Sequence, residues 1–153
     1  MQSDERQAIT LQPVATVHHD VPDEEVSRRR RDLIAEVHVL PAFADGLLGI
    51  EAYSHLVILF WMHAAPREGE PLQVHPRGDA ALPLTGVFAS RGRSHPNPLG
   101  LAVVDLLERR GNTLRVRRLD AWSGTPVVDI KPYDYYDAYT DLRVPDWLRA
   151  RQR

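Results

Sequence analysis

The segment HLVILFWM at residues 55–62 decides the fold class of this chain. It is an uninterrupted apolar run of strand length, rich in branched and aromatic residues. We interpret it as a buried central strand. A second strand is predicted where Leu33, Ala35, Val37 and Val39 alternate with their neighbours up to residue 40, because a period of two is typical of a strand.

Shorter apolar stretches extend this pattern along the chain. Residues 13–17, 85–89 and 127–130 are predicted short strands, and residues 41–49 a turn-rich connection or short helical piece. Residues 66–83 hold many prolines and are predicted to form a long loop. A short basic helix is expected over 145–153, whereas residues 18–31 are polar and charged, and the RRRR run at 28–31 is interpreted as solvated.

Residues 101–109 are ambiguous between a helix and a strand. Helical spacing of Val103, Leu106 and Leu107 favours a helix, whereas the Gly111-Asn112 pair followed by alternating residues favours a hairpin. We favour the hairpin. The whole pattern predicts an all-β domain with short helices, either a barrel or a sandwich-like fold. A Rossmann sheet is disfavoured, since no Gly-x-Gly-x-x-Gly motif follows a strand.

Composition limits the class of protein. The 153 residues, 43% apolar and 26% charged, fit one soluble domain with a real core. The formal net charge of -2 argues against strong sequence-independent binding of nucleic acid. No cysteine is present, no apolar run is long enough to span a bilayer, and residues 1–6 resemble no signal peptide, so the cytoplasm is the expected compartment.

Two polar loops that contain proline and glycine hold most of the candidate functional residues. The first is SRGRSHPNPLGL at residues 90–101, and the second is GTPVVDIKPY at residues 124–133. Proline fixes φ and glycine permits unusual backbone, so both loops are expected to be rigid and rich in donors. We therefore predict one site for a polar or anionic ligand, built from both loops.

Individual side chains in and near these loops have a functional and a structural interpretation. Arg91, Arg93 and His95 would grip one anion if extended, or form a solvated loop face. Asn97 is either a positioned hydrogen-bonding group or a turn residue. Asp120 and Asp129 flank the second loop's start, where they would bind ligand hydroxyls or an amine, or serve as turn caps.

The remaining candidates are histidines and tyrosines. His63 ends the apolar strand eight residues after His55, about 26 Å away on a straight strand, so the two are not expected to share a metal. We predict no metal site. Tyrosines that follow Lys131 would either stack on a base or form an interface patch.

Several ordered motifs together resemble one known family. They are GIEAYSHLVILFWMH (49–63), VHPRGD (74–79), GVFASR (86–91), PNPLGL (96–101) and GTPVVDIKPY (124–133). On these the chain resembles the TrmO (TsaA, YaeB-like) family of S-adenosylmethionine-dependent methyltransferases. The resemblance implies a compact antiparallel β-barrel spanning residues 13–140, with a flexible N-terminus at 1–12 and a basic tail at 141–153.

The resemblance also implies function, cofactor and partners. Family members are homodimers that bind S-adenosylmethionine near the dimer interface and methylate the exocyclic nitrogen of threonylcarbamoyladenosine beside the tRNA anticodon. The catalytic candidates are His63, His95 and Asp120. The predicted cofactor-binding residues are His63, Arg91, Asn97, Leu101, Asp120, Gly124, Thr125, Pro126 and Val127.

The chain departs from the family pattern in its first loop. Gly92-Arg93 stands where the family has Ser-Pro, His95 replaces an Arg, and Ser123 replaces an Asp before the Gly-Thr-Pro. The sequence also ends soon after the barrel segment, so no further C-terminal domain is expected. Two alternatives therefore stay open: a methyltransferase with a different small acceptor, and a non-catalytic S-adenosylmethionine-binding protein.

Overall fold

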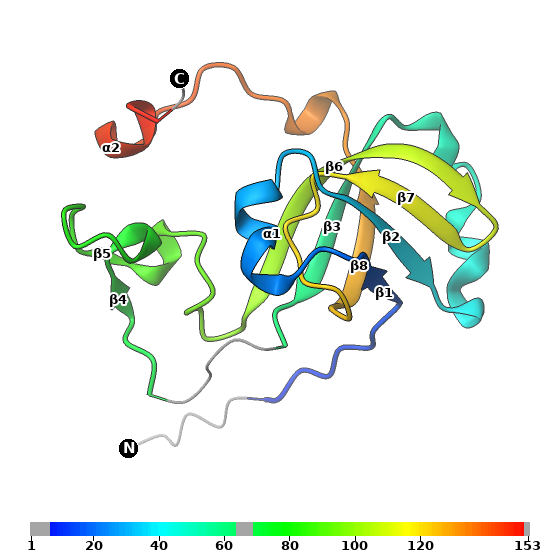
Figure 1. The fold of residues 1–153 in the computed structure, drawn as a ribbon, viewed down its shortest axis with the longest axis horizontal. Coiled ribbons are helices and arrows are strands. Elements are labelled where there is room, and N and C mark those ends of the chain that lie inside the picture. The colour runs from blue at the N-terminus through cyan, green and yellow to red at the C-terminus, as the bar shows by residue number, and fades with distance from the viewer. Residues whose placement is uncertain (1–6, 64–68, 152–153) are drawn as a thin grey trace.

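Six antiparallel strands close into a barrel. The computed structural model describes residues 7–63 and 69–151. Going round the barrel, the strands follow the order β1-β2-β7-β6-β3-β8 (Figure 1). Their bounds are β1 (Ala15–His18), β2 (Ile34–Val39), β3 (His55–Trp61), β6 (Leu99–Arg110), β7 (Thr113–Arg117) and β8 (Pro126–Pro132). The predicted all-β antiparallel barrel is confirmed, and closure leaves no free barrel edge.

Strand β3 lies between β6 and β8, as expected for a central strand. Ile58 is paired with Ala102 on one side and with Ile130 on the other. Leu56, Ile58 and Phe60 are buried inside the barrel, whereas the alternate residues are only half-buried. The predicted strand is confirmed, and its burial is complete on one face only. A closed antiparallel barrel has an inside and an outside, and the outside of β3 remains apolar.

The β6–β7 hairpin confirms the preferred interpretation of residues 101–118. Arg110 pairs with Thr113 across a turn in which Gly111 has φ 56°, a left-handed conformation that favours glycine. The helical alternative for residues 101–109 is wrong. A register shift between Leu106 and Glu108 marks a β-bulge, which explains why Leu106 and Leu107 break the alternation in the sequence.

The barrel core is made of inward-facing side chains from every barrel strand. Branched and small residues dominate it, as in other small barrels. Its fully buried larger side chains are Leu33, Leu56, Ile58, Leu114, Leu119, Val17, Val26, Val37, Val104, Val116 and Val127. The alternation predicted for residues 33–39 is confirmed, because Leu33, Ala35, Val37 and Val39 all point into this core.

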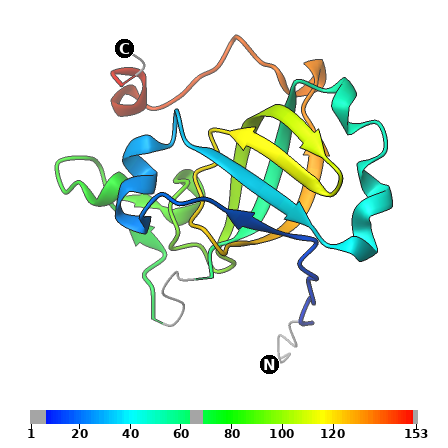
Figure 2. The same cartoon turned by 45° about the vertical axis from the view of Figure 1, so that its right-hand side comes forward.

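One α-helix lies at the end of the barrel where β1 ends and β2 begins (Figure 2). The helix α1 (Asp23–Arg29) joins β1 to β2 and buries Val26 in the core (Figure 2). The sequence interpretation missed it and treated residues 18–31 as merely polar. The missed signal was an acidic first turn after Pro22 and a basic last turn, which matches the helix dipole.

Short 3-10 helices close one end of the barrel. The helices η1 (Pro41–Leu47) and η2 (Ile50–Ala52) connect β2 to β3, which confirms a short helical piece within residues 41–49. Leu47 is buried beneath them. None of the described helices is long and apolar enough to cross a membrane.

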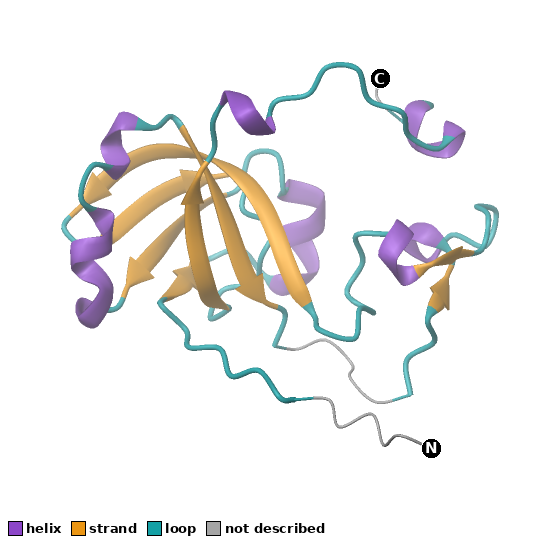
Figure 3. Ribbon diagram, turned by 180° about the vertical axis from the view of Figure 1, so that it is seen from behind, coloured by secondary structure: helices purple, strands orange, loops and turns teal. Residues whose placement is uncertain are grey.

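Residues 69–98 leave the barrel between β3 and β6. They hold a two-stranded sheet of β4 (Gln73–Val74) and β5 (Thr85–Gly86), with η3 (Pro76–Gly78) and η4 (Val87–Ala89), which lies beside the barrel (Figure 3). The strand predicted over 85–89 is therefore only two residues long. Part of the predicted 66–83 loop lies outside the described residues.

The C-terminal segment runs back along the molecule. After η5 (Tyr135–Asp137), it ends in α2 (Asp146–Arg149), which begins after Pro145 as predicted. Arg151, two residues after α2, forms an ion pair of 3.5 Å with Asp79, so the end of the described chain contacts the 69–98 segment. Half of the predicted flexible N-terminus, residues 1–6, lies outside the described residues, as do residues 152–153.

Candidate functional site

A cavity of about 360 Å³ lies between α1, the end of β3 and the loop that precedes β8. Its volume falls in the usual range for small-molecule sites, roughly 300–1,000 Å³. The lining residues are Ser27, Phe60, Met62, His63, Arg93, Asp120, Ala121, Trp122 and Thr125. Three predicted site residues, His63, Asp120 and Thr125, therefore meet here. We call this the main cavity.

Backbone hydrogen bonds hold the wall of the main cavity against β1. Gly124 N donates to Val17 O at 2.7 Å, and Val17 N donates to Thr125 O at 3.0 Å. Thr125 N closes a turn by donating to Trp122 O at 3.2 Å. Gly124 has φ 87°, so this turn needs a residue without a side chain. Thr125 is 3% exposed, the one buried polar residue among the described ones.

Asp120 carries the most informative electrostatics in this cavity. Partial burial raises the pKa of the Asp120 carboxyl above its ordinary value, and the positive charge of Arg30 opposes that rise. No hydrogen bond or ion pair joins its carboxylate to another described residue. A carboxyl with a raised pKa in a cavity is suited to accept a proton or to attract a cation.

The loop of residues 90–97 does not bring its three cationic side chains together. Arg93 lines the main cavity. The guanidinium of Arg91 donates to Leu101 O at 3.2 Å on the outside of β6. His95 Nε2 lies 2.8 Å from Ser90 O, and its ring meets the Phe88 ring edge to face. The alternation therefore does not produce a single anion grip, because local hydrogen bonds bend the loop.

Other predicted cofactor residues lie elsewhere in this chain. Asn97 and Pro126 line a second cavity of about 440 Å³ on the outside of the barrel, beside Trp61. Val127 is fully buried in the core, and Leu101 is 47% exposed on the outer face of β6. Within one copy, both polar loops contribute to each of these two cavities: Arg93 and Thr125 line the main cavity, and Asn97 and Pro126 line the second one.

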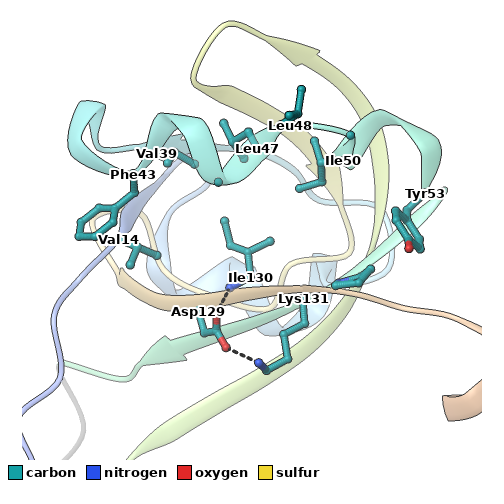
Figure 4. Close-up of a pocket in the computed structure, with 13 residues that line it drawn as sticks. Val14, Val39, Phe43, Leu47, Leu48, Ile50, Tyr53, Asp129, Ile130 and Lys131 are labelled. Carbon is teal, nitrogen blue, oxygen red and sulfur yellow. Dashed lines mark hydrogen bonds and ion pairs between the residues drawn. The ribbon is translucent and has the colours of Figure 1, made fainter.

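Asp129 lies apart from Asp120 in a third cavity. This cavity, of about 300 Å³, lies between β8 and the η1 and η2 helices and is mostly apolar (Figure 4). Asp129 Oδ2 forms an ion pair of 2.8 Å with Lys131 Nζ, and Asp129 Oδ1 accepts a hydrogen bond from Ile130 N. The two aspartates that flank the Gly124 turn therefore lie in different cavities, because strand β8 carries Asp129 away from the loop.

His55 belongs to a charged cluster at the other end of β3. Its Nε2 atom lies 2.9 Å from Asp105 Oδ1, its Nδ1 atom lies 2.7 Å from Ser54 Oγ, and Arg117 Nε donates to Asp105 Oδ2 at 2.8 Å. His55 therefore lies in this charged cluster, whereas His63 lies in the main cavity at the opposite end of β3. In residues 7–63 and 69–151, no three histidine or carboxylate side chains lie close enough to hold a metal ion.

Sequence reasoning missed five of the nine residues that line the main cavity. Ser27 was missed because α1 was missed. Phe60 and Met62 were assigned to the apolar strand, and Ala121 and Trp122 were not considered as site residues. The sequence contained a signal for Phe60 and Met62. Inward-facing side chains near the end of a barrel strand lie at the opening of the barrel, where a ligand can reach them.

The comparisons with known proteins give one consistent family. The tRNA-methyltransferase O N-terminal domain family matches residues 13–138. A probable S-adenosyl-L-methionine-binding protein of Archaeoglobus fulgidus is 51% identical over 98 residues, which cover 64% of this chain and 26% of the relative. The tRNA (adenine(37)-N6)-methyltransferase of Escherichia coli K12 is 40% identical over 104 residues, which cover 64% and 44% of the two chains.

A solved structure agrees with the sequence relatives. The crystal structure of TrmO superposes with a TM-score of 0.72 at 30% identity, covering 90% of this chain and 63% of that one. This chain therefore spans about a quarter of the archaeal relative and less than half of the bacterial enzyme. The similarity concerns the barrel rather than the whole length of those proteins.

Proposed function

The chain belongs to the family of the tRNA-methyltransferase O N-terminal domain, and from that premise we propose that it is an S-adenosyl-L-methionine-dependent methyltransferase. The proposed acceptor is the exocyclic nitrogen of threonylcarbamoyladenosine beside the tRNA anticodon. The observation that carries the proposal is the main cavity, in which Asp120, His63 and Arg93 converge at the end of β3.

The side chains of the main cavity fit the cofactor chemically. S-adenosyl-L-methionine carries a sulfonium cation, an ammonium group, a carboxylate and an aromatic base. Aromatic faces attract cations, and Phe60 and Trp122 supply such faces. The Asp120 carboxylate attracts the positive groups, while the Arg93 guanidinium matches a carboxylate. The buried Thr125 turn supplies a polar wall.

Methyl transfer to nitrogen also needs a place for one proton. When bound, S-adenosyl-L-methionine supplies an activated methyl group, so that nitrogen gains the methyl carbon, the carbon–sulfur electron pair stays on sulfur, and nitrogen loses a proton. Asp120 is the best candidate to accept that proton, because partial burial raises the pKa of its carboxyl. His63 lines the same cavity and is the second candidate.

We further propose that a second copy of the chain completes the site. Arg91 and Leu101, which the family resemblance assigns to the cofactor, lie on the outside of β6 rather than in the main cavity. The outer face of β6 is apolar, a typical property of interfaces. Its exposed apolar residues are Leu99, Leu101, Val103 and Leu107. Pairing through this face would join Arg91 of one copy to the cavity of another.

A second candidate function is cofactor binding without tRNA methylation. It is favoured by the names of archaeal relatives, which are given as S-adenosyl-L-methionine-binding proteins. It is also favoured by the loop, where Gly92-Arg93 and His95 replace the family residues. A methyltransferase acting on another small acceptor accounts for the same two observations.

Nucleoside analysis of tRNA tests the proposed acceptor. Mass spectrometry of tRNA from a strain that lacks the gene should show loss of the methylated threonylcarbamoyladenosine, and the purified protein should restore it with S-adenosyl-L-methionine. Asp120→Asn should lower the rate in the restored reaction by about 10²-fold or more, the usual contribution of a general base. Asp129→Asn, a carboxylate of another cavity, is the matched control.

The outcomes separate the candidates. Unchanged nucleosides together with cofactor binding in calorimetry would exclude tRNA methylation and favour a binding protein. Methyl transfer that appears only after a metabolite extract is added would favour a small acceptor. An unchanged rate for Asp120→Asn would remove Asp120 as the base and leave His63.

A further inference from the structure

A cationic cleft lies at the end of the barrel where α1 leads into β2. It has a volume of about 340 Å³ and is lined by Arg31, Asp32, Asp105, Arg117 and Arg118. The main cavity and the proposed cofactor chemistry use none of these residues. In Figure 1 the α1–β2 connection and the end of β7 meet at this end of the barrel.

One arginine of the cleft is already paired, and two are not. Arg117 Nε donates to Asp105 Oδ2 at 2.8 Å, and Asp105 also lies 2.9 Å from His55. Desolvation acts to raise the pKa of Asp105, but the hydrogen bond from Arg117 and the neighbouring charges lower it below its usual value. Among the described residues, neither the Arg31 nor the Arg118 side chain has a hydrogen bond or an ion pair.

The charge of the cleft matches that of a single phosphodiester. Three guanidinium groups face two carboxylates, Asp32 and Asp105, which leaves one excess positive charge. Arginine also presents a planar set of donors that suits phosphate oxygens. Both free arginines are exposed, so an anion in solution reaches them without a change of the fold.

The backbone of Arg118 adds an independent observation. Arg118 has φ 79°, in the left-handed region that residues with a side chain rarely adopt. Arg118 N donates to Leu33 O at 2.9 Å, which holds it beside the Arg31 segment. Strained backbone at a position where glycine would fit better is typical of functional sites.

The cleft and the main cavity have no lining residue in common, but the same two chain segments contribute to both. The α1 segment contributes Ser27 to the cavity and Arg31 to the cleft, and the strand-to-loop segment contributes Asp120 to the cavity and Arg118 to the cleft. The charge of Arg30, which precedes Arg31 in the chain, acts on Asp120. Residues 118 and 120 are at most about 7 Å apart along the chain. A nucleic-acid strand in the cleft therefore lies beside the cavity.

We propose that the cleft of Arg31, Arg117 and Arg118 binds a backbone phosphate of the RNA acceptor and so presents the nucleotide to the main cavity. This inference rests on the proposed function insofar as the acceptor is RNA. The Arg side chains supply position rather than base specificity, because phosphate contacts carry no sequence information.

Binding of a fluorescein-labelled tRNA anticodon stem-loop, followed by anisotropy without S-adenosyl-L-methionine, tests the proposal. Arg118→Gly should weaken RNA binding about threefold to tenfold, the range expected for a partly exposed charge contact. It should also reduce the slope of log affinity against log salt by about 0.7, the value for one single-strand phosphate. Arg31→Gln should act in the same direction.

Arg77→Gly is the matched control. Arg77 also has a left-handed backbone, with φ 59°, but lies on η3 in the 69–98 segment. Both glycine substitutions should leave the unfolding temperature unchanged or higher, because glycine relieves the strain. Only Arg118→Gly should weaken RNA binding. Equal RNA affinity for Arg118→Gly and Arg77→Gly, or an unchanged salt slope, would overturn the proposal.

A second titration separates RNA from free phosphate. If Arg118→Gly abolishes binding of inorganic phosphate but leaves RNA affinity intact, the cleft holds a small anion and the RNA proposal is wrong. The assay needs no methyl transfer. RNA binding that depends on Arg31 and Arg118, without any methylated product, would therefore refute the proposed function while supporting the cleft.

Discussion

The ring of Phe60 on β3 lies over Gly100 of β6, in the space that a Cβ atom at Gly100 would occupy. The two residues are register partners, and Phe60 is buried while it also lines the main cavity. The glycine therefore lets an aromatic ring lie flat against the neighbouring strand. This contact joins the packing of the barrel to the wall of the candidate site.

Gly100→Ala should destabilise the protein by about 2–3 kcal/mol, because the new methyl group overpacks the Phe60 ring. Urea unfolding measures the change. Gly92→Ala is the matched control, since its Cβ would meet only Ser90 Oγ at 3.5 Å, an ordinary contact. Adding Phe60→Leu to Gly100→Ala should recover part of the loss; strict additivity of the two would contradict the contact.

Asp120→Asn should not destabilise the protein at pH 7. The folded-state pKa of Asp120 is raised above 3.8, so protons bind the folded state more tightly and the ionised carboxylate costs stability once the pH exceeds the folded pKa. The variant should unfold at an equal or higher temperature at pH 7, and the difference should vanish as the pH falls toward 3.8. A lower unfolding temperature at pH 7 would contradict this environment.

Asp105→Asn should have the opposite effect. The folded-state pKa of Asp105 is lowered below 3.8, so its stabilising contribution is present above pH 3.8 and is lost as the pH falls through the folded value. We expect a loss of about 1 kcal/mol at pH 7, since the hydrogen bonds to Arg117 and His55 are partly exposed.

Denaturant unfolding at pH 7 and near pH 3 measures that difference. Glu108→Gln is the control, because it removes the more exposed pair with Arg110 and should cost less. An Asp105→Asn effect of equal size at both pH values would show that packing rather than charge is responsible.

Leu101→Asp should dissociate the proposed dimer and weaken cofactor binding together. Charge in the middle of an apolar face opposes its burial. Sedimentation and calorimetry on the same samples measure assembly and affinity. Ile34→Asp is matched, because Ile34 is 41% exposed, against 47% for Leu101, and lies on the outside of β2. Tight cofactor binding by a monomeric Leu101→Asp variant would contradict a shared site.

Arg91→Ala tests the same site without disturbing the apolar face. We expect about a tenfold loss of cofactor affinity, which corresponds to one charge-assisted contact. Its fold should be unaffected, because Arg91 is exposed and makes one hydrogen bond, to Leu101 O. Unchanged affinity would show that the family's assignment of Arg91 does not apply to this chain.

Local patterns in the sequence predicted most of the strands of the barrel. The alternation at 33–39 and the Gly111-Asn112 turn depend on side-chain period and backbone freedom, which neighbours along the chain determine. Helix α1 was missed because Val26 alone carries its buried face. A single apolar residue leaves no helical period to detect.

The candidate site was less predictable than the fold. The sequence predicted one site built from residues 90–101 and 124–133, whereas in a single copy these two segments meet at two cavities: Arg93 and Thr125 line the main cavity, and Asn97 and Pro126 line the second. Local hydrogen bonds of His95 and Arg91 bend the first loop. Side-chain direction in a loop depends on such bonds rather than on residue type.

The sequence by itself determined the strand periods, the turns and the family, because each is encoded by residues close together in the chain or by ordered motifs. Only the tertiary structure decided which side of β3 is buried, that Asp120 meets His63 and Arg93, and that Arg31 lies beside Arg118. These pairs are far apart in sequence. Their proximity follows from barrel closure and from the packing of α1 on the barrel, which no local pattern specifies.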